Sequence, residues 1–265
     1  MYLTENALIL REVRFRESDR ILTALTADLG KVTLAAHGAL SKKSRIAAAT
    51  QQLTYAELTL FAKDGRYSVR EAVTREAFAG LRSELERFAL GTYLAECLEL
   101  FASEGQPEPD LLQLGLNSLY AVSEGIGGLK KVKAAFELRL AGLEGYAPAT
   151  DSCAVCGRAD IQEPVFLPDE GMTVCRKCRK DRRRSLPLSD AALTAMRHIL
   201  NAAPKKMLSF SLEDADLDLL AKVSENWLLH CTGREISSLQ YYRNLIGGVL
   251  SRETERPEEI PRGKE

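Results

Sequence analysis

The stretch "RILTALTADLGKVTLAAHG", residues 20–38, decides the fold of the first part of this 265-residue chain. Val32, Leu34 and Ala36 occupy every second position, which is typical of a strand with one buried face. Asp28-Leu29-Gly30 separates this segment from the apolar run before it, and Gly30 can adopt the positive φ of a tight turn. The stretch therefore predicts two strands joined by a short turn.

A second stretch, "YAELTLFAK" at residues 55–63, shows the same alternation. Its inward positions are expected to be Ala56, Leu58, Leu60 and Ala62. The turn "KDGR" follows at 63–66, where Asp-Gly favours a primed hairpin. With about five short strands expected between Ala7 and Thr74, this part predicts a small barrel or sandwich.

From Glu76 onward the apolar period changes to that of helices. Leu90, Leu94, Cys97, Leu98 and Phe101 form one helical stripe, and further helices are expected at 109–125, 128–145, after Leu188 and at 212–231. The last residues, 251–265, are charged and contain two prolines, so a disordered tail is expected there.

Four cysteines, Cys153, Cys156, Cys175 and Cys178, follow the pattern C-x2-C-x18-C-x2-C. Two such pairs suit tetrahedral zinc, and four thiolates would leave no open position, so the zinc would be structural. The alternative is a set of reduced structural cysteines. Cys97 and Cys231 lie on apolar helical stripes and are expected to be small buried residues.

The segment around the second pair, "CRKCRKDRRRS" at 175–185, contains seven basic residues. Arg176 and Lys177 favour a solvated surface beside a metal turn. For the rest of the run, a solvated surface and a phosphate contact both remain open.

Composition and missing motifs exclude several classes of protein. No apolar run reaches the ~18 residues of a membrane helix, and no secretory signal is recognisable, so a cytoplasmic protein is expected. Phosphate-loop, zincin and serine-hydrolase motifs are missing, and the three histidines, His37, His198 and His230, are scattered. An enzyme is therefore not expected.

Positive charge is concentrated in the first part, where residues 1–75 contain 12 Lys and Arg against 8 Asp and Glu. Loops between barrel strands are where such barrels grip polyanions. The candidate contacts lie in two clusters: Arg14, Arg16 and Arg20, then Lys42, Lys43 and Arg45. Phe15 and Tyr67 could stack on bases, although packing in the core is the favoured use of both.

Several of these stretches, taken together, resemble the RecO family of bacterial recombination mediators. The resemblance covers about residues 1–180. It is carried by "ESDRILTALTADLGKVTLAAHGALSKKSR" (17–45), "EAVTREAFAGLRSELERFALGTYLAECLEL" (71–100), "FELRLAGLEGYAP" (136–148) and the paired cysteines.

The resemblance implies an α+β multidomain protein: an OB-fold barrel at residues 1–77, a helical domain at 78–250 and an inserted zinc module at about 150–182. It also implies binding of single- and double-stranded DNA, strand annealing and recombinase loading. RecR and the acidic C-terminal tail of single-stranded DNA-binding protein would be its partners, and neither a membrane nor a small-molecule substrate is expected. The basic residues that match the family are Arg20, Lys31, Lys42, Lys43 and Arg45.

Two other functions remain open at this point. The chain could be a zinc-containing protein adaptor without direct DNA binding, in which case the barrel would be structural. It could also be an RNA-binding zinc-ribbon protein, which competition between RNA and DNA would separate from a DNA mediator. If DNA is the ligand, the location would be the cytoplasm, in association with the nucleoid.

Overall fold

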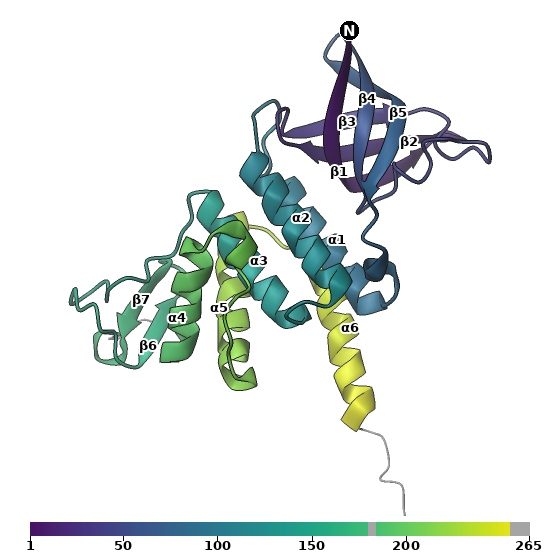
Figure 1. Cartoon of the computed structure of the whole chain (residues 1–265). Coiled ribbons are helices and arrows are strands. Elements are labelled where there is room, and N and C mark those ends of the chain that lie inside the picture. Colours follow the sequence, from purple (N-terminus) through teal and green to yellow (C-terminus); the bar gives the residue numbers. More distant parts are fainter. Residues whose placement is uncertain (180–183, 255–265) are drawn as a thin grey trace, which may run out of the picture.

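A computed structural model describes residues 1–179 and 184–254 of the chain (Figure 1). Five strands come first: β1 (Tyr2–Phe15), β2 (Asp19–Thr26), β3 (Lys31–Ala36), β4 (Tyr55–Lys63) and β5 (Arg66–Glu76). The 3-10 turn η1 (Ala79–Arg82) then leads into α1 (Leu85–Phe101), α2 (Pro109–Glu124) and α3 (Leu129–Leu143).

The remaining elements begin with the strands β6 (Pro164–Leu167), β7 (Met172–Cys175) and β8 (Leu186–Pro187), with the 3-10 turn η2 (Arg176–Cys178) after β7. The last helices are α4 (Asp190–Asn201), α5 (Asp214–Thr232) and α6 (Ser237–Thr254), with η3 (Pro204–Lys206) between the first two.

The five N-terminal strands close into a barrel in the order β1-β2-β3-β5-β4. All neighbours are antiparallel except β3 and β5, which pair in parallel. This arrangement confirms the predicted OB-fold barrel. Of the predicted inward residues, all but Ala62 are buried in the barrel core: Val32, Leu34, Ala36, Ala56, Leu58 and Leu60. Ala62, near the end of β4, is half-buried.

Both predicted turns are present. Asp64 and Gly65 have φ values of 50° and 72°, as a primed hairpin requires. Gly30 has a φ of 62°, and it also lies directly against the loop between α1 and α2. A Cβ at this position would stand 2.3 Å from the Gln106 carbonyl oxygen and 2.5 Å from that of Ser103.

Strand β1 is buried on both faces where it passes between the barrel and the helices. Ala7 and Ile9 belong to the barrel core, whereas Leu8 and Leu10 belong to the core of the helical part. A bidentate ion pair between Arg11 and Glu99 of α1 adds a polar link beside this junction. The barrel and the helices therefore share one continuous interface.

The helical part follows the predicted periodicity. Helix α2 ends at Gly125, which has a φ of 70°, and the cysteine Cys97 of α1 is fully buried. At its centre Glu137 is completely buried, and its carboxylate accepts hydrogen bonds from Lys133, Tyr93 and Ser224. These contacts tie α1, α3 and α5 together.

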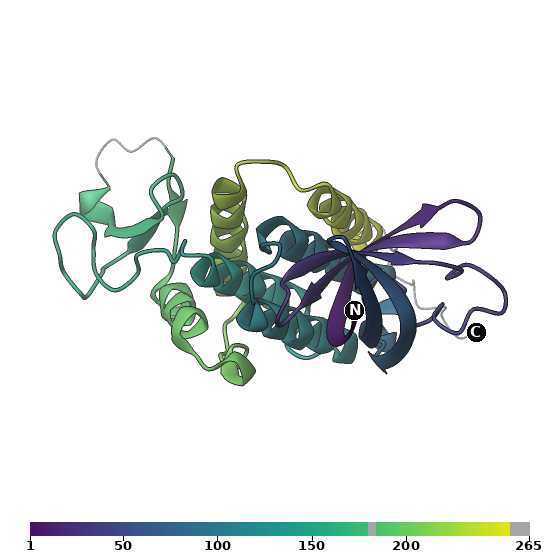
Figure 2. The same cartoon turned by 90° about the horizontal axis from the view of Figure 1, so that it is seen from above.

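The cysteine segment forms a small three-stranded sheet, in the order β7-β6-β8, at the end of the molecule far from the barrel (Figures 1 and 2). The sheet packs on the helices through the indole of Trp227. The ring lies so close to Gly171 that a Cβ there would be 2.3 Å from it. The indole N–H donates to the carbonyl of Tyr146, and Phe166 meets the ring edge-on.

The expected tail boundary at residue 251 is not where the helix ends. Helix α6 continues to Thr254, so residues 251–254 are helical, and 255–265 lie outside the described residues. Within the described ranges, none of the helices combines the length and the apolar character needed to span a bilayer.

We predict that Gly30→Ala destabilises the protein more than Gly65→Ala does. Both glycines have positive φ, a conformation that costs a residue with a Cβ about 1–3 kcal/mol. Only Gly30 meets backbone oxygens, whereas a Cβ at Gly65 meets nothing within 4 Å. Urea unfolding of the two variants would measure the difference, and equal midpoints would contradict the close approach of the barrel to the helices.

Candidate nucleic-acid interface and metal centre

The β1–β2 turn and the loop after β3 lie against each other at one end of the barrel. The Leu40 amide donates to the Ser18 carbonyl at 2.8 Å, and the Gly38 amide donates to the Asp19 carboxylate at 2.8 Å. His37 Nδ1 lies 3.0 Å from the other oxygen of Asp19. The Gly38 amide and then His37 hold the pKa of Asp19 below its usual range, so this tether stays charged.

This tether brings most of the predicted basic residues to the same end of the barrel. We call the five that are exposed there the loop cluster: Arg14, Arg16, Lys42, Lys43 and Arg45. None of their side chains has a hydrogen-bond or ion-pair partner among the described residues. In Figure 2 the purple and indigo loops of the barrel project on the side away from the cysteine segment.

Arg20 and Lys31, by contrast, both make contacts within the fold, with Arg20 buried and Lys31 half-buried. Arg20 is 9% exposed, and its guanidinium donates to the Ala47 carbonyl and to Thr50 while lying 3.4 Å from Glu12. It holds the long loop after β3 in place. Lys31 lies at the start of β3, where its ammonium donates to the Glu99 carbonyl of α1. Both side chains are thus used in the fold.

A hollow on the outer surface of the barrel, which we call the barrel groove, was not predicted from the sequence. It has a volume of about 640 Å³ and lies where β3, β4 and β5 meet. Its lining residues are Ala35, His37, Phe61, Lys63, Asp64, Arg66, Tyr67, Ser68 and Arg70. Three full cations face one carboxylate in this groove, so it favours an anionic ligand.

A row of outward side chains crosses all the strands through this groove. The strand register pairs neighbouring positions in the order Val13, Ile21, Ala35, Ser68, Phe61 and Tyr2. Five of the six are apolar or aromatic, and all are at least partly exposed. The Arg70 guanidinium lies 5.1 Å from the centre of the Phe61 ring, and Tyr2 packs against the same ring.

Phe15 corrects another expectation. We expected it in the core, but its side chain is 45% exposed at the end of β1, and the Arg16 guanidinium lies 5.1 Å from its ring centre. Tyr67 is half-buried at the edge of the groove. Tyr67 also packs against the barrel core, as expected, so Phe15 is the exposed ring of the two beside the row, where a planar base could stack on it.

The four predicted metal ligands come together as the spacing implied. The sulfurs of Cys153, Cys156, Cys175 and Cys178 all lie within 4.8 Å of one another, and those of Cys156 and Cys175 are 3.9 Å apart. A tetrahedron of sulfurs around one zinc ion would have edges of about 3.8 Å. The cluster could therefore hold a metal ion.

Backbone amides favour the thiolate of Cys153, whereas crowding and burial raise the pKa of Cys175 and Cys178. Burial would raise the pKa of Cys153, but amides of Cys156, Cys175 and Val155 point at its sulfur and lower the pKa to about 6. The hydrogen bond with Cys156, then burial, raises the pKa of Cys178 to about 12. A bound metal cation would offset the repulsion between thiolates in such a cluster and so favour their deprotonation.

The basic run beside the cluster is only partly described. Arg176 forms an exposed ion pair with Glu163, and Arg184 contacts Asp169 and Asn226. Residues 180–183 lie outside the described part of the chain, so the predicted surface there is not placed.

A smaller hollow lies in the helical part between α2, α3 and η3, with a volume of about 190 Å³. Its walls are Asp110, Leu114, Asn117, Arg139, Leu143, Pro204 and Met207. The side-chain amide nitrogen of Asn117 is buried and has no acceptor among the described residues. A ligand with an apolar group and a carboxylate would match this lining.

Comparison with known proteins gives matches along nearly the whole chain. Residues 1–78 match the family model "Recombination protein O N terminal", and residues 82–240 match "Recombination protein O C terminal". The DNA repair protein RecO of Acetivibrio thermocellus is 31% identical over 244 residues, which cover 92% of this chain and 97% of that protein.

Two further relatives have the same name. The DNA repair protein RecO of Desulforudis audaxviator is 33% identical over 244 residues, with 92% of this chain and 97% of that protein covered. The one from Listeria monocytogenes serovar 1/2a is 25% identical over 238 residues, with 90% and 92% covered.

We predict that Cys175→Ser lowers the metal content of the purified protein below that of the unmodified protein. The substitution removes one of four sulfurs, and a water or the serine hydroxyl in its place binds zinc more weakly than a thiolate does. Elemental analysis would measure the metal. Cys231→Ser is the matched control, because Cys231 lies outside the cluster on α5. Metal content that is the same in both variants would contradict the assignment.

Proposed function

The chain belongs to the RecO family of DNA repair proteins, and we propose that it is a non-catalytic mediator that binds DNA through its barrel. The observation that supports this proposal most is the placement of cations. The loop cluster and the barrel groove meet at His37. This residue lines the groove, and its ring bonds to the Asp19 carboxylate, which holds the loop of the cluster in place. Together they give one barrel surface the charge that a phosphate backbone requires.

The chemistry of that surface favours a single strand of DNA. Arginine and lysine bind phosphates and release counterions, while exposed rings stack on bases irrespective of sequence. The row from Val13 to Tyr2 provides an apolar path for bases, and Arg14, Arg66 and Arg70 lie beside it. These groups hold and position a strand, and we assign them no part in bond breaking.

Annealing of complementary strands, and loading of recombinase onto DNA coated by single-stranded DNA-binding protein, are the further activities that we propose. RecR and the acidic tail of that binding protein are the proposed partners. For the tail we favour the hollow at Arg139 and Asn117, since it offers an apolar wall and an amide donor without an acceptor among the described residues. One nitrogen of Arg139 already donates to the Ile199 and Leu200 carbonyls, so its other nitrogens would meet the tail, opposite the Asp110 carboxylate. With DNA as its ligand, the protein would work in the cytoplasm on the nucleoid.

The division of labour that we propose follows the chain. Residues 1–77 bind nucleic acid, residues 78–250 form the helical part that docks partners, and the cysteine module at about 150–182 holds a structural zinc ion. Zinc suits the site because four sulfurs satisfy it completely, so it would stabilise a segment whose own core is small.

We predict that replacing Lys42, Lys43 and Arg45 by alanine weakens binding to all sequences alike. Each phosphate contact on a single strand adds about 0.7 to the slope of log affinity against log salt, so the slope should flatten by about two. Fluorescence anisotropy of a labelled oligonucleotide at several salt concentrations would measure both quantities.

A control of equal charge is available on the far side of the molecule. Lys205, Lys206 and Lys222 are exposed outside the barrel, and their triple alanine variant should bind as the unmodified protein does. If the Lys42, Lys43 and Arg45 variant also binds unchanged, the loop cluster is not the DNA contact. If the unmodified protein binds no oligonucleotide yet still captures RecR, an adaptor role replaces the proposal.

We further predict that Phe61→Ala lowers affinity for single-stranded DNA about tenfold and affinity for duplex much less. Stacking on an aromatic ring is worth about 1–3 kcal/mol per base, and bases inside a duplex are not free to stack. Phe61→Trp is the control that keeps a ring. Equal losses for single strand and duplex would argue against stacking at this row.

A further inference from the structure

The motif at residues 175–185 is the largest feature that the proposed function does not use. Three exposed cations lie in or near this motif and have no side-chain partner among the described residues: Arg158, Lys177 and Arg179. Leaving unpaired cations close together costs electrostatic energy, which an anionic ligand would remove. The question is whether the surface around them has the shape to hold one.

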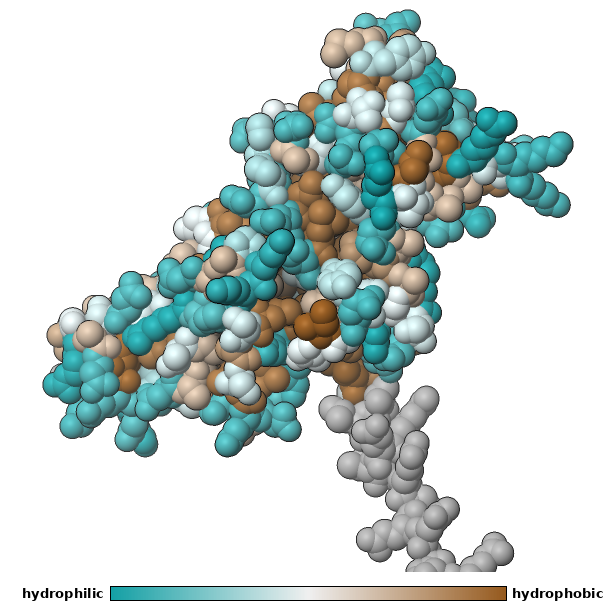
Figure 3. Space-filling view, viewed as in Figure 1, coloured by the Kyte–Doolittle hydropathy of each residue, from teal (hydrophilic) through white to brown (hydrophobic). Residues whose placement is uncertain are grey.

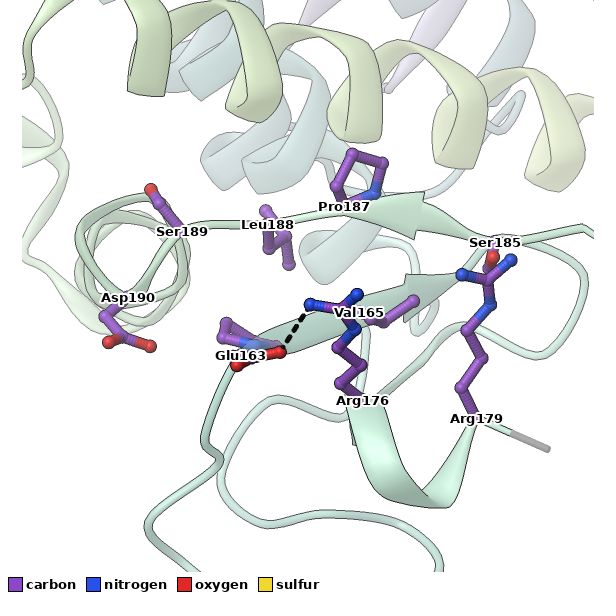
Figure 4. Close-up of a pocket in the computed structure, with 10 residues that line it drawn as sticks. Glu163, Val165, Arg176, Arg179, Ser185, Pro187, Leu188, Ser189 and Asp190 are labelled. Carbon is purple, nitrogen blue, oxygen red and sulfur yellow. Dashed lines mark hydrogen bonds and ion pairs between the residues drawn. The ribbon is translucent and has the colours of Figure 1, made fainter.

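Figure 4 shows a hollow beside this motif with a volume of about 570 Å³. Arg176 and Arg179 rise from η2 along one side of it, and Val165, Pro187 and Leu188 form its apolar surface. The carboxylate of Glu163 is already paired with Arg176, and Ser185 adds a hydroxyl to the lining. Ser189 and the Asp190 carboxylate complete the lining, so the hollow combines the side that carries Arg176 and Arg179 with an apolar side and one further carboxylate.

A second hollow, of about 560 Å³, adjoins the first. The two share Glu163 and Arg176. The second adds Arg158, Gln162 and Lys177, together with the proposed metal ligands Cys156, Cys175 and Cys178, so these cations surround the metal site. We call the two together the module surface. Its cations are therefore spread along a path, rather than gathered at one point as a single carboxylate or phosphate would need.

This surface lies far from the barrel. Figure 2 shows the cysteine module at one end of the molecule and the barrel at the other, with the helices between them. Figure 3 shows hydrophilic side chains at both ends. A ligand held at the module surface is consequently independent of one held at the loop cluster.

We propose that the module surface is a second nucleic-acid site, so that one chain holds two separate strands. The path of cations matches successive phosphates, and the apolar surface of the first hollow can receive a base or sugar. A nucleic acid fits better than an acidic peptide, because the cations extend through both hollows. The site extends the proposed function, but it stands on a different surface.

A stoichiometric titration tests the proposal with the metal-loaded, full-length protein and a labelled thymidine oligonucleotide of about eight nucleotides, within the range of one OB-fold site. The unmodified protein should bind about two oligonucleotides per chain. Arg158→Glu combined with Arg179→Glu should bind about one, and so should a barrel variant in which Lys42, Lys43 and Arg45 are replaced by glutamate, a charge reversal that goes further than the alanine changes above. The two sets combined should bind none.

Each other outcome is decisive. If the Arg158→Glu and Arg179→Glu variant binds two, or the barrel variant alone binds none, the second site is overturned while the barrel site is unaffected. If the barrel variant still binds two oligonucleotides while the Arg158→Glu and Arg179→Glu variant binds one, the proposed barrel function fails and the module site stands. If a glutamate-rich peptide of equal charge displaces the oligonucleotide from the barrel variant, the site is for protein and the proposal is wrong.

Two controls exclude indirect effects. Lys205→Glu with Lys222→Glu makes the same change in charge on another surface and should leave about two oligonucleotides bound. Metal content is measured in every variant. Should the charge reversal lower it, Arg158→Gln with Arg179→Gln removes the charges without adding carboxylates beside the cysteines, and the same stoichiometries apply.

Discussion

The burial of β1 on both faces is the constraint on which the arrangement of this molecule depends. Alternate residues of one strand fill two different cores, so the barrel cannot turn relative to the helices without exposing leucines on one side. The Arg11–Glu99 ion pair and the close approach at Gly30 fix the same junction from both sides. The helices thereby hold the basic barrel surface and the distant cysteine module at a fixed separation.

Much of this could be predicted from sequence, because the determining patterns are local. Alternation at Val32, Leu34 and Ala36 predicted a strand of the barrel, and Gly30 marked the turn that precedes it. The cysteines Cys153 and Cys175 were grouped by spacing alone, since a metal site of this type has few workable spacings. Resemblance to a family then supplied the topology that alternation left open between a barrel and a sandwich.

The rest depends on contacts between distant residues. Arg20 was predicted as a DNA contact, but Thr50, 30 positions later, takes up its guanidinium. The barrel groove was not predicted for a different reason, because the alternation of each strand was used only for its inward positions. The outward positions of "FAKDGRYSVR" place Phe61, Lys63 and Arg70 on one surface, and reading both faces of the alternation would have found them.

The seat of the cysteine module has a practical consequence. The chain has a single tryptophan, and Trp227 is the residue that packs on Gly171, between the two cysteine pairs. Its indole also stacks on His230 and meets Phe166, so its surroundings combine both parts of the molecule. Tryptophan fluorescence of the unlabelled protein thus comes from one residue, and its emission maximum would register any loosening of the module from the helices.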